Sequence, residues 1–213
     1  MPLRFLITLG FQTTEGAVLR HFDWESKTIV RDLEYRSPTA TFLERLRAEG
    51  TPLPENITPK CKFSGGMVRG DHFYTCAFNE VVRIHLGNWA VDWTFSDRCF
   101  NDLHHAYVND SGIYLSNSGL DTVELFDHQG RHVRRYPIRR EPPESWIAPD
   151  IDYRFVPQTK HEAHPHEVIP WKDTLLVNVP VRREVARLDD LTPMVTGFSP
   201  MMHDGIRREA SVG

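Results

Sequence analysis

The sequence predicts an all-β protein, a β-propeller of four-stranded antiparallel blades. Short apolar or alternating segments recur along the chain and are separated by Gly, Asn, Asp and Pro, which is the pattern of antiparallel meanders. These segments recur in groups at roughly 40–60 residues, a spacing typical of propeller blades. Turns such as NDSG and DHQG contain residues that tolerate the positive φ of tight turns. A β-sandwich or barrel is the alternative architecture.

The repeat is clearest when His105 is aligned with His166, an offset of 61 residues. Without a gap, this alignment also places Asn117 on Asn178. The preceding copy aligns HFYTCAF with GIYLSNS and VVRIHL with TVELFD. Each full copy therefore reads as four short strands.

The whole chain, 1–213, is predicted to form one propeller domain. The expected elements in order are a partial blade at 1–36, a helical insertion at 37–50, a blade at 61–99, a blade at 101–138, a Pro-rich loop at 139–160, a blade at 164–199 and the first strand of a further blade at 201–213. The N-terminal copy lacks a first strand and the C-terminal copy has only that strand. Either the terminal strands pair to close the ring, or the chain is a truncated propeller with an exposed sheet edge.

Composition narrows the class of protein. A formal net charge of −4 argues against a general nucleic-acid binder. No apolar run reaches the roughly 18–20 residues that cross a bilayer, so we expect no membrane insertion. Three cysteines without an export signal favour a reducing compartment, and we predict a cytoplasmic protein.

Three histidines occupy the start of the first strand in successive copies: His105, His166 and His203. First strands line the central channel of a propeller, so we expect these imidazoles to converge near the axis. Three imidazoles can bind a divalent metal ion such as Zn, Mn or Fe and leave one position open. The acidic neighbours Glu167 and Asp204 are the predicted catalytic residues, because either could move a proton beside such an ion.

Neighbouring residues extend the predicted site. Asp102 could orient an imidazole from outside the ligand set. His104 should point to the face opposite His105, because side chains alternate along a strand. In the tract HEAHPH, His161, His164 and His166 lie close together, and we favour His166 as the residue that points inward.

Two other interpretations of the histidines remain open. They can fix the start of each strand by hydrogen bonding to a loop, or they can line a polar pocket for an anionic ligand. The arginines of RRYPIRR are either a solvated strand edge or an anion site. Trp146, within the Pro-rich loop, is a candidate ligand contact.

The segment FNDLHHAYVNDSGIYLSNSGLDTVELFDHQG resembles repeats of six-bladed propellers of the NHL, SMP-30 and TolB-like type, and blades of YVTN and arylsulfotransferase-like proteins. The resemblance is strongest over 100–136 and weaker over 164–206. It implies a fold and no particular activity. Some propeller enzymes of this kind, lactonases and lyases among them, carry axial metal sites, but the acidic and Asn ligands of the lactonases are not recognisable here.

The sequence therefore predicts a propeller that binds a small-molecule ligand at a histidine-lined axial site. If the protein is an enzyme, metal-dependent lyase or hydrolase chemistry is the best prediction. The alternatives are a non-catalytic scaffold for a protein partner and a fragment of a larger propeller without activity of its own.

Overall fold

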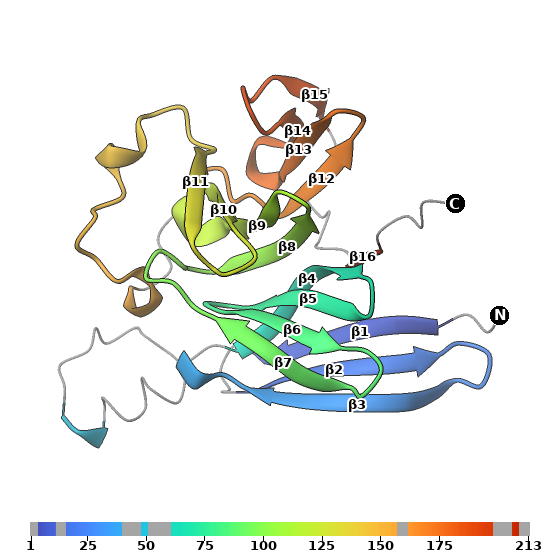
Figure 1. Ribbon diagram of the computed structural model, residues 1–213. Coiled ribbons are helices and arrows are strands. Elements are labelled where there is room, and N and C mark those ends of the chain that lie inside the picture. Colours follow the sequence, from blue (N-terminus) through green and yellow to red (C-terminus); the bar gives the residue numbers. More distant parts are fainter. Residues whose placement is uncertain are drawn as a thin grey trace.

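The computed structural model describes residues 4–11, 16–39, 48–50, 61–156, 162–197 and 206–208. In these ranges the chain forms antiparallel sheets that follow one another along the sequence (Figure 1). The predicted all-β class is confirmed. Most of the insertion expected to be helical, residues 40–47, lies outside the described ranges.

Two sheets are four-stranded meanders in which consecutive strands pair. Sheet C contains β8 (Leu103–Asn109), β9 (Gly112–Asn117), β10 (Thr122–Phe126) and β11 (His132–Pro137). Sheet D contains β12 (Glu167–Trp171), β13 (Thr174–Val179), β14 (Glu184–Arg187) and β15 (Pro193–Thr196). In both sheets the strand that comes first in the chain, β8 or β12, makes contact with a neighbouring sheet, as the inner strands of propeller blades do.

The remaining strands form one larger sheet in the order β3-β2-β1-β4-β5-β6-β7. Its N-terminal part is β1 (Arg4–Phe11), β2 (Gly16–Asp23) and β3 (Thr28–Arg36). Its second part, sheet B, is β4 (Cys61–Arg69), β5 (His72–Ala77), β6 (Val81–His85) and β7 (Ala90–Phe95). The two parts are joined by the short pairing of Gly10 with Lys62 and Phe11 with Cys61.

The C-terminal strand β16 (Ile206–Arg208) pairs in parallel with β4, opposite Gly66–Val68. The sequence left open a closure in which the two terminal strands pair with each other. In the described residues the C-terminal strand instead adds to β4, whose edge β1 covers only at its beginning.

The core lies between adjacent sheets. One cluster joins sheets B, C and D, and Phe95, Phe100 and Phe126 form its aromatic centre with edge-to-face contacts at 5.2–5.3 Å. A second cluster packs β2 and β3 against sheet B around Leu19 and Phe73. Each fully buried aromatic or leucine side chain contributes about 1.5–3 kcal/mol of transfer free energy.

The Pro-rich segment leaves sheet C and folds into two single-turn helices, η2 (Pro143–Ser145) and η3 (Tyr153–Phe155) (Figure 1). Ile147 and Tyr153 bury themselves against Leu120, and Trp146 packs on this cluster. The segment is thus fixed to the end of β9 rather than extending into solvent.

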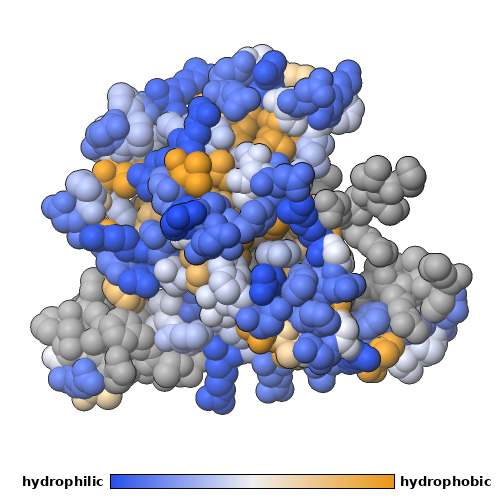
Figure 2. Space-filling view, in the orientation of Figure 1, coloured by the Kyte–Doolittle hydropathy of each residue, from blue (hydrophilic) through white to orange (hydrophobic). Residues whose placement is uncertain are grey.

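No helix in the described ranges is long and apolar enough to cross a membrane. The face shown in Figure 2 is mainly hydrophilic, with separate hydrophobic patches.

Candidate functional site: a histidine centre between two sheets

Three imidazoles meet where the chain enters sheets C and D. These are His104, His164 and His166, which we call the histidine centre, and one ligand nitrogen from each lies within 4.8 Å of the others. The rings of His104 and His166 stack with centroids 4.5 Å apart and planes 12° apart. His164 meets both rings edge-on, at 4.8 and 4.7 Å. His104 and His166 are buried and His164 is partly exposed, so the centre is accessible from one side.

His104 is placed by an irregularity in β8. Leu103 pairs with Asn117 and His105 pairs with Ser116, so His104 is the extra residue of a β-bulge. Asp102 has a left-handed backbone, with φ of 52°, immediately before this bulge. The bulge and the left-handed residue together aim the ring of His104 toward the segment that leads into β12.

Asp102 also contacts the ring of His104, with Oδ2 at 3.4 Å from Nε2. Burial by itself raises the pKa of Asp102, but the contact with His104 and the charges of Lys62 and His164 outweigh burial and hold the pKa well below its usual range. The carboxylate is therefore ionised and lies where it can fix the orientation of the His104 imidazole.

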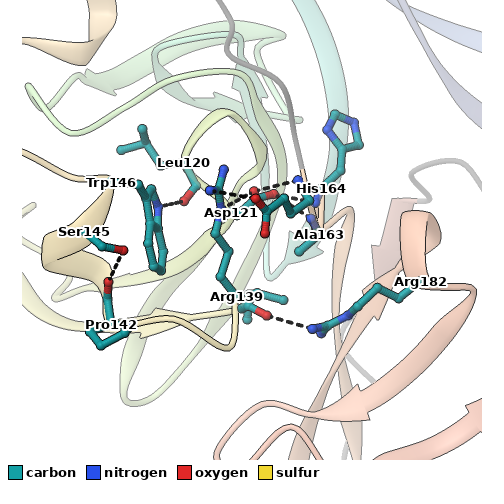
Figure 3. A network of polar contacts seen from close by, with 11 residues as sticks. Leu120, Asp121, Arg139, Pro142, Ser145, Trp146, Ala163, His164 and Arg182 are labelled. Atoms are coloured by element: carbon teal, nitrogen blue, oxygen red, sulfur yellow. Dashed lines mark hydrogen bonds and ion pairs between the residues drawn. The ribbon is translucent and has the colours of Figure 1, made fainter.

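His164 is placed by Asp121, which comes from the other sheet. Oδ1 of Asp121 accepts hydrogen bonds from the backbone N–H groups of Ala163 at 3.1 Å and His164 at 2.6 Å, and Oδ2 accepts one from Glu162 at 2.9 Å (Figure 3). His164 itself has a left-handed backbone with φ of 52°. Three amide donors on one buried carboxylate hold that conformation.

Asp121 is in turn paired with Arg139, whose Nε lies 2.7 Å from Oδ2. Burial raises the pKa of Asp121, but the three backbone hydrogen bonds and Arg139 outweigh it, so the pKa is lowered. The Arg139 guanidinium lies 4.9 Å from the Trp146 ring centre, and the Trp146 indole N–H donates to the Leu120 carbonyl at 2.9 Å (Figure 3). Trp146 therefore makes structural contacts, and its role as a ligand contact stays a prediction.

His166 begins sheet D. Its backbone N–H donates to the Asn178 carbonyl at 3.0 Å, which aligns it with the start of β12. The Ser118 hydroxyl of sheet C donates to the carbonyl of Pro165. The left-handed backbone of His164 and the position of His166 bring their rings to 4.7 Å from each other, on either side of Pro165 in the sequence.

The predicted ligands are brought together only in part. His166 belongs to the centre, but its partner from sheet C is His104 rather than His105. His105 is fully buried, and its Nε2 lies 3.9 Å from Oε1 of Glu167, the predicted catalytic residue. His203 and Asp204 lie outside the described residues.

The hairpin registers explain the exchange of His104 for His105. The tip of the first hairpin of sheet C is Asn109 paired with Gly112, and the tip in sheet D is Trp171 paired with Thr174. The two sheets are therefore related by an offset of 62 residues, not the 61 of our alignment. A shift of one residue exchanges the two faces of a strand.

With the offset of 62, His104 corresponds to His166 and Asp102 corresponds to His164. The backbone agrees, because Asp102 and His164 share the same left-handed φ of 52°. In sheet B, where the tip is Arg69 paired with His72, the residue that corresponds to Asp102 is Lys62. Equivalent positions of three successive sheets thus place Lys62, Asp102 and His164 near the histidine centre.

The arginines of RRYPIRR are largely committed to structural contacts. Arg135 pairs with the fully buried Glu124 at 2.7 Å, and Arg139 pairs with Asp121. A cavity of about 550 Å³ borders this run, but Glu141, Asp189 and other acidic groups line it beside the arginines. Its charges compensate one another, so the geometry does not favour an anion site there.

Comparisons with known proteins were made in sequence and in structure. Neither a protein-family model nor a curated protein matches this chain in sequence. The WD40 domain of Neurospora crassa Pan2 aligns with a TM-score of 0.52 and 9% identity, over 89% of this chain and 45% of that chain. The chain folds as part of a β-propeller.

Two further solved structures are similar. Myxococcus xanthus glutaminyl cyclase aligns with a TM-score of 0.51 and 12% identity, over 92% of this chain and 75% of that chain. The β-propeller domain of Myceliophteria thermophila Cps50 (Swd1) gives 0.49 and 11%, over 89% and 52%. This chain spans about half the length of the Pan2 and Swd1 chains. Identities this low show the fold alone, and the finer resemblance to NHL, SMP-30, TolB-like and YVTN propellers stays a prediction.

Proposed function

We propose that the chain binds a divalent metal ion at the histidine centre and holds it between sheets C and D. The observation that supports this is the convergence of three imidazole nitrogens from two sheets within 4.8 Å of one another. In a tetrahedral zinc site, metal–nitrogen bonds of about 2.0–2.1 Å place the nitrogens about 3.4 Å apart. To bind one ion, the nitrogens, which now lie within 4.8 Å of one another, must therefore come closer, and the stacked rings of His104 and His166 must turn toward a common point.

The donor set favours zinc over harder ions. Imidazole suits Zn²⁺, Cu²⁺ and Fe²⁺, whereas Mg²⁺ and Ca²⁺ prefer oxygen ligands. Three protein ligands leave a fourth position for water or a small ligand, and the partly exposed His164 marks the accessible side. A metal in such a site supplies a Lewis acid, the chemistry that hydrolases and lyases use. Asp102, beside the ring of His104, is the chain's own group for orienting that ligand.

The test is metal content and affinity of the purified chain. We expect close to one equivalent of zinc by mass spectrometry after incubation and dialysis, and loss of binding in His104→Ala, His164→Ala and His166→Ala. His128→Ala is the matched control, because His128 is exposed and remote in sequence from the centre. The sequence predicted His105 as a ligand, whereas the structure places His104 in the centre. His105→Ala should therefore retain zinc binding. Equal binding by all variants, or none by the folded parent, would overturn the proposal.

A non-catalytic role as a scaffold for a protein partner is the second proposal. Its support is the similarity to the Pan2 WD40 domain, together with the exposed side chains of Val133 on β11 and Ile151 in the Pro-rich segment, 56% and 42% exposed. A scaffold predicts that Val133→Glu with Ile151→Glu abolishes partner binding while zinc affinity is unchanged. If the metal site is the functional one, the histidine variants should lose zinc affinity while partner binding is unchanged.

A further inference from the structure

We propose that Asp121 is a positioning residue of the histidine centre, and that the Pro-rich segment sets metal affinity through Arg139 and Asp121. This inference rests on the proposed metal-binding function. It assigns a purpose to a buried carboxylate that does not belong to the ligand set.

Asp121 is fully occupied by donors from two distant segments. Its two oxygens accept the N–H groups of residues 162–164 and the Nε of Arg139, at 2.6–3.1 Å. The side chain is completely buried. Because every contact fixes another part of the chain, Asp121 acts on the centre only through the residues that it holds.

The residue that Asp121 holds most closely is the strained ligand. A left-handed backbone is disfavoured for an L-amino acid by contact between its Cβ and the following carbonyl oxygen, and His164 adopts it with φ of 52°. The hydrogen bond of 2.6 Å from His164 N–H to Asp121 compensates for this cost. Without it, the backbone can relax toward an extended form and carry the imidazole away from His104.

The Pro-rich segment holds Asp121 from the other side. Arg139 pairs with the Asp121 carboxylate, and the Trp146 ring packs on the Arg139 guanidinium. The indole N–H of Trp146 donates a hydrogen bond to the carbonyl of Leu120, the residue before Asp121. A contiguous series of contacts thus runs from Trp146 through Arg139 and Asp121 to His164 (Figure 3). Displacement of the segment, by a mutation or a bound partner, would loosen the metal ligand at the far end.

Sheet B contains a similar device that serves no metal ligand. Glu80 directly precedes β6, as Asp121 precedes β10, and it accepts hydrogen bonds from Tyr35, Ser37 and Thr39. A buried carboxylate before the third strand is therefore a recurring way to capture a distant segment. At Asp121 the captured segment, residues 162–164, carries one of the three imidazoles and leads directly to a second, His166.

The experiment uses Co²⁺, whose visible spectrum reports coordination geometry, with Zn²⁺ competition for affinity. We expect Asp121→Asn to weaken binding about 10–100-fold, the usual effect of changing an outer-shell partner, and to change the Co²⁺ spectrum. The asparagine NH₂ cannot accept hydrogen bonds, so some of the hydrogen bonds from the backbone N–H groups of residues 162–164 are lost. Arg139→Gln should weaken binding less, and Arg139→Lys should restore most of the affinity.

Arg131→Gln is the matched control, because Arg131 pairs with Asp127 at the other end of sheet C. Circular dichroism checks that each variant is folded, and Arg139→Gln decides the question if Asp121→Asn does not fold. Parent-like affinity and spectrum in folded Asp121→Asn and Arg139→Gln would overturn this inference and leave the metal site intact. A parent that binds no Co²⁺ would instead refute the proposed function.

Discussion

The buried carboxylate of Glu80 offers a direct test of how a distant segment is held to sheet B. Glu80 is 2% exposed, and its oxygens accept hydrogen bonds from Tyr35 Oη at 2.7 Å, Ser37 Oγ at 2.8 Å and Thr39 N at 2.7 Å. Hydrogen bonds to a charged group contribute about 1.5–3 kcal/mol each. In Glu80→Gln the amide oxygen can keep the contacts to Ser37 and Thr39, and only the bond from Tyr35 changes character. We therefore expect the free energy of unfolding to fall by about 2–3 kcal/mol.

The assay is urea denaturation followed by circular dichroism, with Tyr35→Phe and the double variant completing a cycle. Because the two groups share one hydrogen bond, we expect a coupling energy of about 1–2 kcal/mol. Tyr107→Phe is the control, since Tyr107 is 8% exposed, close to the 7% of Tyr35, and should cost little. Additive effects, or a change below about 0.5 kcal/mol in Glu80→Gln, would refute the idea that this carboxylate holds the segment.

Three further predictions follow from the site and its surroundings. Zinc at 100 times its dissociation constant should stabilise the parent by about 2.7 kcal/mol, a rise in Tm of roughly 5–10 °C by calorimetry, and this rise should vanish in His104→Ala. Burial, with the charge of Glu80 second, raises the pKa of Tyr35 far above its ordinary value, so stability should be unaffected below pH 10 and fall as the pH rises above the unfolded pKa of about 10. Tyr35→Phe should flatten that alkaline loss in a pH series of urea midpoints. His164→Gly should be about 0.5–1 kcal/mol more stable than His164→Ala in urea, because glycine alone tolerates φ of 52° without strain, and neither variant should bind zinc.

The fold class was predictable because sheets C and D, and each part of the larger sheet, are local meanders with their own turn residues. Segments such as NDSG place a tight turn between Asn109 and Gly112, and the structure has that turn. The pairing of β1 and β16 with β4 was not predictable. It depends on which part of the β4 edge remains uncovered, and no local pattern in the sequence reports that.

A cluster of histidines from successive sheets was predictable from the sequence, but the sequence did not identify which histidines form it. Identities such as Asn117 with Asn178 favoured an offset of 61, and this aligned His105 with His166. Aligning the hairpin tips instead would have given 62 and selected His104. The bulge at His104 adds to this misalignment, because side chains no longer alternate between the two faces of a strand where it contains an extra residue. His164 had a visible signal, since it lies two residues before His166 in the tract HEAHPH, but its left-handed backbone could not be read from that spacing.

The backbone at the histidine centre is left-handed at two corresponding positions, Asp102 and His164. Of the non-glycine residues with positive φ in the described ranges, Lys27, Trp89, Lys172 and Leu191 lie in turns between successive strands. Asp102 and His164 instead precede β8 and β12, the first strands of sheets C and D. Glycine adopts this conformation most readily, and asparagine, aspartate and histidine are the other residues enriched in it, so both positions carry residues that suit it. What distinguishes His164 from the turn residues is its surroundings. The buried Asp121 accepts its backbone N–H at 2.6 Å, and its ring lies 4.8 and 4.7 Å from the rings of His104 and His166. This combination of a held backbone and converging rings is the reason to test His164 as a ligand.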